Sequence, residues 1–257
     1  MTTSAQRVLV ERQGAILIIT INRPQVRNAI DKATADGIAT ALAELDKSPD
    51  LRVGIITGAG GNFCTGMDLK AFLAGERPAA AGRGFAGIVE RPPDKPLIAA
   101  VEGYALAGGF EIALSCDLVV SAQDARFGLP EVKRGLLAGG GGLLRLPERV
   151  PYHLAMQWAL TGDAVPATEV AAVHLVTELT PPGGALAAAV DFASRIAANG
   201  PLAVRATKRI IVESRDWPGP ERFARQKMIY EPVRSSEDAR EGALAFRERR
   251  APVWRGR

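Results

Sequence analysis

Residues 103–111 read Gly103-Tyr104-Ala105-Leu106-Ala107-Gly108-Gly109-Phe110-Glu111, and this stretch decides how the fold is interpreted. It follows Leu97–Val101, an unbroken apolar run of the kind found in strands that are buried on both faces. The small residues at 107–109 let a ligand approach the main chain closely, and we expect a helix near Phe110–Ser115. That helix would aim the positive end of its dipole at the same place, with Glu111 in its first turn. Taken alone, an ordinary contact between a helix and a strand also explains the stretch.

On both sides of this stretch, apolar strands alternate with helices, which is typical of an α/β protein. Asp31 is expected to be the N-cap of a helix that runs to about Lys47, with Leu42 and Leu45 on its apolar side. The residues at 74–84 are rich in Ala, Gly and Pro, and we expect a mobile loop there. Further strands are expected at Val8–Glu11, Ala15–Ile21, Arg52–Thr57 and Leu118–Ser121.

A second segment of interest is the Gly-rich loop Gly58–Gly66, which leads into Met67-Asp68-Leu69-Lys70. A helix is expected to begin at Met67 or Asp68, and the backbone N–H groups at a helix start are free to bind negative charge. An ordinary loop between a strand and a helix explains this segment better when it is considered alone.

Two more segments follow downstream. In Phe127–Glu131, Pro130 suits the first position of a helix and Glu131 falls in its first turn. Glu111 and Glu131 are 20 residues apart, and this spacing does not by itself show that the two carboxylates meet. Gly135–Leu146 contains a glycine run, but no Lys-Ser/Thr follows, so a P-loop is rejected and a flexible loop that caps a helix is preferred.

The last part of the chain is predicted to be helical. Helices are expected at Leu186–Ala198, Leu202–Ser214, Glu221–Tyr230 and Glu237–Arg249. Gly200-Pro201 and Trp217–Pro220 interrupt them. We therefore place a boundary near Asn199, which divides a core of residues 1–199 from a helical region of residues 200–257.

Composition and charge limit the possible functions. The chain has 257 residues, of which 47% are hydrophobic and 23% charged, as in a globular protein. Its net charge is +4, and Arg240–Arg257 alone carries six arginines against Glu241 and Glu248. A broad basic face or a nucleic-acid-binding motif is not evident, so we expect no nucleic-acid partner. A local basic patch suits a small polyanion such as a nucleotide-bearing cofactor, although a solvated helix face with a ragged tail explains it more simply.

The N-terminal residues contain no leader pattern, and no apolar run approaches the length of a membrane span. We expect a cytoplasmic protein without a membrane partner, whose Cys64 and Cys116 are free thiols. His153 and His174 are the only histidines, which does not suggest a metal site, and no Ser–His nucleophile motif is recognisable. Cys64 is interpreted as a small loop residue.

Taken in order and spacing, these segments resemble the enoyl-CoA hydratase/isomerase, or crotonase, superfamily from about Gly14 to the C-terminus. The resemblance implies an α/β fold built as a spiral of ββα units, with a helical C-terminal trimerisation region and a homotrimer or hexamer as the assembly. It is carried by Asn22-Arg23-Pro24, Gly58–Lys70, Gly108–Glu111, Cys116-Asp117, Phe127–Glu131 and the tail from Ser236 to Pro252.

The resemblance also implies a site and a reaction. The backbone N–H groups of Met67 and Gly108 would form an oxyanion hole, and Glu111 and Glu131 would be the two catalytic carboxylates of a hydratase. The expected substrate is an acyl-CoA thioester of fatty-acid or lipid metabolism, with no cofactor and no metal. Residues implied to contact the acyl-CoA are Arg27, Ala29, Asp68, Leu69 and Lys70, with Phe246 and Arg249 covering the CoA of a neighbouring subunit. Arg249 lies three residues after Phe246, so we expect both side chains to project from one side of a helix.

Other functions of the same family stay open at this stage. A Δ3,Δ2-enoyl-CoA isomerase needs only one acid/base group, so the presence of both glutamates favours hydration. Leu144-Arg145-Leu146-Pro147 also occurs in the carnitinyl-CoA dehydratase branch. Ala138 and Leu143 stand where the family often has Pro and Thr, which leaves the preferred acyl chain open. A non-catalytic acyl-CoA-binding protein is the alternative from a different functional class.

Overall fold

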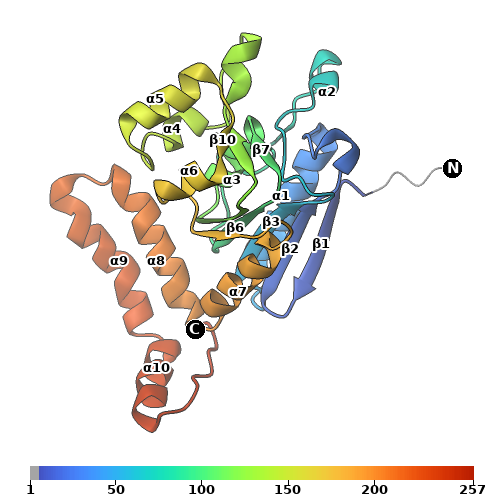
Figure 1. Cartoon of the computed structure of the whole chain (residues 1–257). Coiled ribbons are helices and arrows are strands. Elements are labelled where there is room, and N and C mark those ends of the chain that lie inside the picture. The colour runs from blue at the N-terminus through green and yellow to red at the C-terminus, as the bar shows by residue number, and fades with distance from the viewer. Residues whose placement is uncertain (1–5) are drawn as a thin grey trace.

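A computed structural model describes residues 6–257, and its centre is a six-stranded sheet (Figure 1). The first five residues of the N-terminal segment considered for a leader lie outside this range. Only the β1–β2 pair is antiparallel; the other neighbouring strands of this sheet run parallel. The strand order is β1 (Val8–Gln13), β2 (Ile16–Ile21), β3 (Val53–Gly58), β6 (Leu97–Val101), β8 (Leu118–Ala122) and β11 (Glu178–Thr180).

Both faces of this sheet are covered, because successive side chains along a strand point to opposite sides. In β2, Leu17, Ile19 and Ile21 join the larger core, which includes helix α1 (Lys32–Lys47). Ile16 and Ile18 point the other way and pack with the alanines of helix α7 (Ala185–Ala197). The continuous apolar runs predicted as buried strands are therefore explained by helices on both faces.

Helix α1 begins and packs as predicted. The Asp31 carboxylate accepts a 2.9 Å hydrogen bond from the backbone N–H of Thr34, which makes Asp31 the N-cap. Leu42 and Leu45 are fully buried on the side of the helix that faces the sheet.

A ββα unit repeats along the chain, with one strand in the central sheet and the next in a three-stranded sheet of order β10-β9-β7. One unit is β6, β7 (Tyr104–Leu106) and helix α3 (Gly108–Leu114). The next is β8, β9 (Arg126–Gly128) and the 3-10 helix η2 (Pro130–Arg134). The chain after β3 follows the same course, since Cys64 bridges Ala105 of β7 before helix α2 (Leu69–Leu73). The expected spiral of ββα units is thus present.

Some details differ from the sequence predictions. Helix α3 begins at Gly108, two residues before the predicted Phe110, because Ala107 already turns the chain into the helix. The segment 74–84, predicted to be a loop, contains the strand β4 (Ala79–Ala80), which pairs antiparallel with β5 (Gly84–Phe85). The remaining elements of the core are α4 (Gly142–Arg145), α5 (Tyr152–Thr161), β10 (Val165–Pro166) and α6 (Ala167–Ala172).

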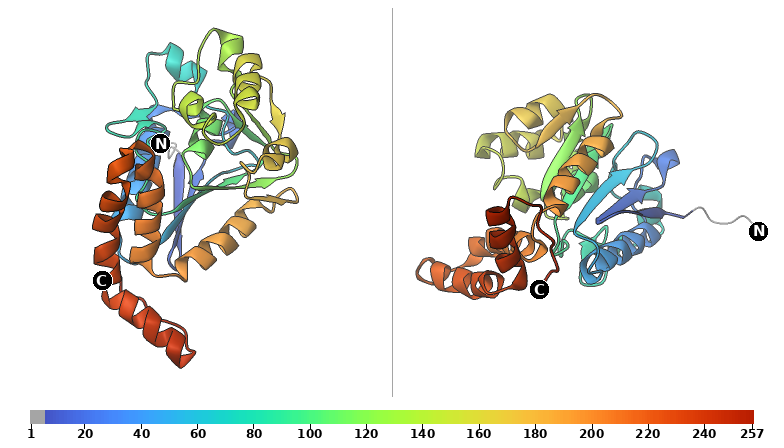
Figure 2. Two further views of the ribbon diagram at one scale, coloured as in Figure 1. Left: turned by 90° about the vertical axis from the view of Figure 1, so that its left-hand side faces the viewer. Right: turned by 90° about the horizontal axis from the view of Figure 1, so that it is seen from below.

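The C-terminal helices stand away from the sheet core, and the left-hand view in Figure 2 shows α10 projecting beyond it. This region consists of the helices α8 (Pro201–Glu213), α9 (Arg222–Arg234) and α10 (Glu237–Glu248), and the 3-10 turns η3 (Ser214–Asp216) and η4 (Gly219–Glu221) connect α8 to α9. A further 3-10 turn, η1 (Pro24–Val26), lies near the N-terminus, after β2. Within residues 6–257, none of the helices is both long enough and apolar enough to cross a membrane.

The chain after α10 is fixed and is not the ragged tail that the charge pattern suggested. The Asp238 carboxylate is buried and accepts hydrogen bonds from the backbone N–H groups of Arg255 and Gly256. The indole N–H of Trp254 donates to the Ala198 carbonyl at 2.7 Å, which ties the tail to the end of α7. The tail therefore runs back along α10 and joins it to the junction between α7 and α8.

Candidate active site

The Gly-rich loop after β3 lies directly against the turn that precedes α3. The Cys64 N–H donates to the Tyr104 carbonyl at 2.9 Å, and the Leu106 N–H donates to the Cys64 carbonyl at 3.0 Å. A Cβ atom at Gly66 would lie 2.7 Å from the Ala107 Cβ and 3.0 Å from the Gly108 nitrogen, and Gly66 has a φ of +93°. Glycine is required there because both the backbone angle and the close approach exclude a side chain.

Two backbone N–H groups, those of Met67 and Gly108, flank this contact. Over residues 6–257, neither group has a hydrogen-bond acceptor within the protein. Ala107 has φ +53° and ψ −130°, a conformation that costs a non-glycine residue about 1–3 kcal/mol. Its N–H donates to the Gly128 carbonyl at 2.8 Å, which holds the strained residue in place. The arrangement leaves both N–H groups without an internal partner among residues 6–257, so they can donate to a ligand.

Glu111, in the first turn of α3, is enclosed by the glycine run. Its side chain is buried, with 4% exposure, and its Oε1 accepts a 2.9 Å hydrogen bond from the Gly142 N–H. A Cβ atom at Gly140 would lie 2.5 Å from Glu111 Oε2, so a larger residue at this position would displace the carboxylate. Burial raises the pKa of the Glu111 carboxyl, while the N–H groups of Gly142 and Gly140 and the charge of Arg145 partly oppose the rise.

Glu131 follows Pro130 at the start of η2, as the sequence predicted. Its Oε2 is buried and, among the described residues, has no hydrogen-bond partner. Burial and the negative charge of Glu111 raise the pKa of Glu131 to about 7. Leu129 packs against Gly142, which also touches Glu111. The structure therefore brings the two carboxyl groups within electrostatic reach of each other, which their spacing alone did not establish.

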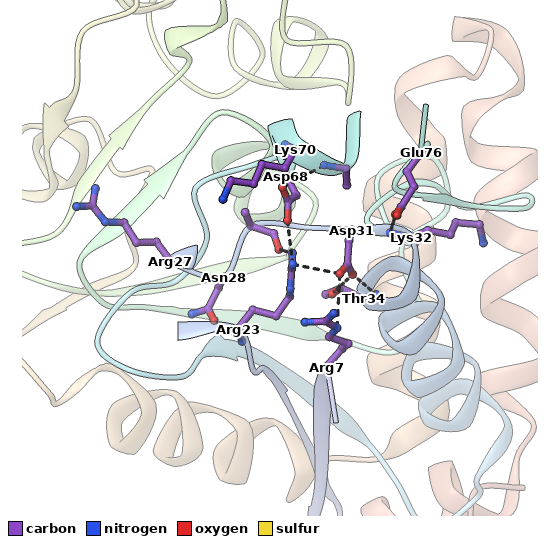
Figure 3. A network of polar contacts seen from close by, with 12 residues as sticks. Arg7, Arg23, Arg27, Asn28, Asp31, Lys32, Thr34, Asp68, Lys70 and Glu76 are labelled. Atoms are coloured by element: carbon purple, nitrogen blue, oxygen red, sulfur yellow. Dashed lines mark hydrogen bonds and ion pairs between the residues drawn. The ribbon is translucent and has the colours of Figure 1, made fainter. Parts of the chain in front are cut away.

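The residues expected to contact acyl-CoA surround the Met67 loop. The exposed side chains of Arg27 and Lys70 extend to the same side in Figure 3, away from the buried ion pairs. The guanidinium carbon of Arg27 lies 5.4 Å from the centre of the Tyr104 ring. Leu69 is exposed and Asp68 is half-buried, whereas the backbone N–H and carbonyl of the buried Ala29 are both hydrogen-bonded within the protein.

One argument about the C-terminal residues is wrong. Phe246 and Arg249 were expected to project from one side of a helix, but α10 ends at Glu248. Arg249 is the C-cap and has the left-handed conformation, with φ +53°, so the helical spacing does not apply to it. Both side chains are exposed, and Phe246 has 88% exposure. Their proposed contact with CoA then depends on a neighbouring subunit and not on a shared helix face.

Several residues at the site were not singled out in the sequence. Gly140 and Gly142 form the wall around Glu111, although the glycine run was predicted to be a flexible loop capping a helix. Phe85 of β5 lies against Gly108, and Arg145 bonds to the Gly140 carbonyl at 3.4 Å. The glycine run itself was the available signal, because consecutive glycines permit close approach of another group.

Cys64 lies next to this site but has the properties of a structural residue. It is fully buried, and burial raises the pKa of its thiol to about 12. A thiol that stays protonated is a poor nucleophile, which agrees with its interpretation as a small loop residue.

Comparison with known proteins gives consistent matches along the chain. The family described as enoyl-CoA hydratase/isomerase matches residues 11–257. Enoyl-CoA hydratase EchA19 of Mycobacterium tuberculosis is 42% identical over 99% of this chain and 98% of its own length. Carnitinyl-CoA dehydratase of Salmonella typhi is 42% identical over 96% of this chain and 97% of its own. The crystal structure of an enoyl-CoA hydratase from Mycobacterium tuberculosis H37Rv is 60% identical, covers 98% of this chain and 100% of its own, and superposes with a TM-score of 0.96.

Proposed function

The chain belongs to the enoyl-CoA hydratase/isomerase family, and we propose that it catalyses the reversible addition of water to the conjugated C=C bond of a 2-enoyl-CoA thioester. The observation that carries this proposal is the pair of interacting carboxyl groups with different surroundings. Glu111 is hydrogen-bonded to Gly142, whereas the buried oxygen of Glu131 has no partner among the described residues. An isomerase needs a single acid/base group, so the retention of two favours hydration.

The N–H groups of Met67 and Gly108 serve as the oxyanion hole. When water adds to Cβ, negative charge develops on the thioester oxygen, and two N–H donors fixed in advance stabilise it. Losing one such donor typically lowers the rate by roughly 10²–10³-fold. The absence of an internal acceptor for either N–H within residues 6–257 supports this role.

The two carboxyl groups divide the proton transfers. The Glu111 carboxylate removes a proton from water as the water oxygen bonds to Cβ, and protonated Glu131 donates a proton to Cα. The Gly142 N–H and the charge of Arg145 favour the ionised form of Glu111. Glu131, with its pKa raised to about 7, retains a proton near neutral pH. Proton exchange with solvent then returns Glu111 to its ionised form and Glu131 to its protonated form. Because the two carboxyl groups interact, their pKa values belong to the pair.

Binding of the CoA portion is assigned to the residues around the oxyanion loop. Arg27 and Lys70 offer positive charge to the phosphates, and Ala29, Asp68 and Leu69 border the thioester. Phe246 and Arg249 of a neighbouring subunit would cover the nucleotide. The reaction adds water to a thioester that carries CoA already, so it requires no further cofactor and no metal.

We also propose a homotrimer, or a hexamer formed by two trimers, assembled through the helical region. Helix α9 buries none of its side chains in the isolated chain, and Phe223 and Met228 are 84% and 70% exposed. Exposed apolar side chains on an otherwise charged helix favour a subunit interface. Sedimentation velocity tests this assembly directly, because a monomeric species at micromolar concentration would contradict it.

A second candidate function is dehydration of carnitinyl-CoA, since the Salmonella typhi carnitinyl-CoA dehydratase is as similar to this chain as the EchA19 hydratase is. Both reactions use the same elimination or addition of water next to a thioester. A cytoplasmic role in fatty-acid metabolism is proposed together with the hydratase reaction.

The deciding experiment measures loss of the conjugated thioester absorbance for a series of 2-enoyl-CoA esters of increasing length, together with the dehydrated form of carnitinyl-CoA. Hydration of one or more straight-chain esters, abolished in Glu131→Gln, is the expected result. Faster conversion of a 3-enoyl-CoA would identify an isomerase. Tight binding of these esters with no turnover would identify a non-catalytic acyl-CoA-binding protein.

A further inference from the structure

Arg23 is a buried cation that contacts two separate segments of the chain, one at Ala29 and Asp31 and the other at Asp68. Its side chain is almost inaccessible, with 6% exposure of the residue, and Figure 3 shows it between the carboxylates of Asp31 and Asp68. Its Nη2 atom lies 2.8 Å from Asp68 Oδ2 and 3.2 Å from Asp31 Oδ2. Its Nη1 donates to the Ala29 carbonyl. Because it is enclosed by these partners, Arg23 is not available to a substrate.

Asp68 uses its two oxygens in different ways. Its Oδ1 accepts hydrogen bonds from the N–H groups of Lys70 and Ala71, at 3.0 and 3.3 Å, and so caps helix α2. Its Oδ2 faces Arg23. The direction in which α2 leaves the oxyanion loop is therefore fixed at one end by the guanidinium group of Arg23.

Met67 lies between two hydrogen bonds to the same residue, Ile30. The Ile30 N–H donates to the Gly66 carbonyl at 2.8 Å, and the Asp68 N–H donates to the Ile30 carbonyl at 2.9 Å. These bonds fix the peptide groups on both sides of Met67 and leave its own N–H without an acceptor among residues 6–257. Arg23 holds both strands of this bridge, one through the Ala29 carbonyl and the other through Asp68.

The energetic cost of burying Arg23 with two carboxylates indicates that the cluster serves to hold the backbone in a defined geometry. Removing three charged groups from water carries a large desolvation penalty, and well-packed apolar side chains of similar volume often give equal or greater stability. The Nε atom of Arg23 is also buried without a partner among the described residues. A planar guanidinium offers several donors at fixed angles, which a flexible ammonium group does not.

We propose that Arg23 is a positioning residue, which acts through Asp68 and Ala29 to hold the Met67 N–H where it meets the thioester oxygen in the transition state. This inference rests on the proposed hydratase function. If the Met67 N–H moved by a fraction of an ångström, its hydrogen bond to the negative charge that develops in the transition state would weaken strongly. Binding of the substrate in the ground state would weaken less. The effect is therefore expected in kcat and not in KM.

The test uses the full-length protein and cinnamoyl-CoA, a conjugated thioester whose absorption moves to longer wavelength when its carbonyl oxygen accepts strong hydrogen bonds. Arg23→Lys keeps the charge but cannot reach all three acceptors with the same geometry. At saturating ligand, we expect it to lose a large part of the wavelength shift. With a good enoyl-CoA substrate, kcat should fall by roughly 10- to 100-fold while KM changes little.

Two further variants complete the test. Asp68→Asn keeps the oxygen that caps α2 but loses the ion pair, so it should reproduce the reduced wavelength shift, and it carries the test if Arg23→Lys fails to fold. Arg7→Gln is the matched control, because Arg7 lies 3.5 Å from Asp31 and has no contact with Asp68. It should retain both the wavelength shift and kcat.

The inference is overturned if Arg23→Lys or Asp68→Asn folds with a lower melting temperature but keeps the wild-type wavelength shift and kcat. That outcome would leave the proposed hydratase function intact. Absence of both the shift and hydration in the wild-type protein is a different result, which would overturn the proposed function and this inference with it.

Discussion

The Oε1 atom of Glu111 accepts a 2.9 Å hydrogen bond from the backbone N–H of Gly142, 31 residues further along the chain. This bond favours the ionised form of a carboxyl group whose burial favours the neutral form. The glycine run thus encloses Glu111 and opposes the rise that burial causes in its pKa, and it does so through main-chain atoms that need close approach.

Gly140→Ala tests this enclosure. Its new Cβ would lie 2.5 Å from Glu111 Oε2, so the carboxylate has to move and the bond to Gly142 is disturbed. We expect the hydration rate to fall by roughly 100-fold, as for misplacement of a reacting group by about 1 Å. Gly139→Ala is the matched control, because its Cβ would meet nothing closer than 3.8 Å. Steady-state hydration kinetics of the two variants should separate clearly; equal activity would show that the glycine at 140 is not required.

Glu131→Gln should nearly abolish hydration while leaving folding and CoA-ester binding intact. The amide has the shape of the carboxyl group but has no transferable proton, and loss of such a group typically costs roughly 10²–10⁴-fold. Stopped assays at high enzyme concentration measure the residual rate, and Glu111→Gln should be similarly impaired in hydration but less so in any isomerase side reaction. A Glu131→Gln enzyme with near wild-type hydration would remove Glu131 from the mechanism.

The rate of hydration should depend on pH on both sides of an optimum. Glu131 has to be protonated to donate to Cα, and its pKa is raised to about 7, so the rate should fall as pH rises through about 7. Glu111 has to be ionised to accept a proton, and because burial raises its pKa, the acidic limb should lie above the usual range of a glutamate. Profiles of kcat/KM report these values for the free enzyme, as properties of the pair. A profile that stays flat from pH 6 to 9 would contradict the assignment.

The raised pKa of Glu131 also predicts how the stability of the fold depends on pH. A carboxyl group with a raised pKa in the folded protein binds its proton more tightly there than in the unfolded chain. The folded state is therefore favoured below the unfolded pKa, and this advantage is lost as pH rises toward about 7. Glu131→Gln removes the titration, so its melting temperature should exceed that of wild type at pH 8 and the difference should shrink at pH 5. A difference independent of pH would show that burial of Glu131 does not shift its pKa.

Local features of the fold were predictable from the sequence because their causes are local. Asp31 caps α1 by accepting a hydrogen bond from the N–H of Thr34, only three residues further along the chain. The apolar runs of β2 and β6 are long enough to be identified as buried strands. Contacts between distant segments were not predictable in this way. The bond from Gly142 to Glu111 and the ion pair of Arg23 with Asp68 join residues 31 and 45 positions apart, and only the packed fold brings them together.

The backbone conformation of two non-glycine residues could not be predicted from the sequence either. Ala107 and Arg249 both have positive φ, although most residues avoid this region and glycine is the usual occupant. Because Ala107 adopts this conformation, α3 begins at Gly108 and not at Phe110, where the sequence predicted its start. Arg249 ended α10 one residue early, which removed the helical-face argument for its pairing with Phe246.

Arg249 nevertheless remains one of the exposed arginines of the tail that are available to a ligand of another subunit, as are Arg240 and Arg255. Arg250 bonds to Glu241 and Glu248, and Arg257 bonds to Glu237. Over the described part of the chain, the exposed side chain of Arg249 makes no ion pair or hydrogen bond. A guanidinium without an internal partner is free to bind a CoA phosphate without breaking an existing contact.

Arg249→Ala should therefore raise KM for CoA esters by roughly tenfold, which corresponds to about 1.4 kcal/mol, with little change in kcat. The effect should shrink as added salt screens the phosphate interaction. A thioester of the same acyl group that lacks the nucleotide should be hydrated equally by mutant and wild type. Arg247→Ala is the control, because Arg247 is exposed on α10 next to Glu248 and is not assigned to the site. If Arg249→Ala instead loses the same factor on both thioesters, or changes only the sedimentation coefficient, Arg249 serves the assembly and does not bind CoA.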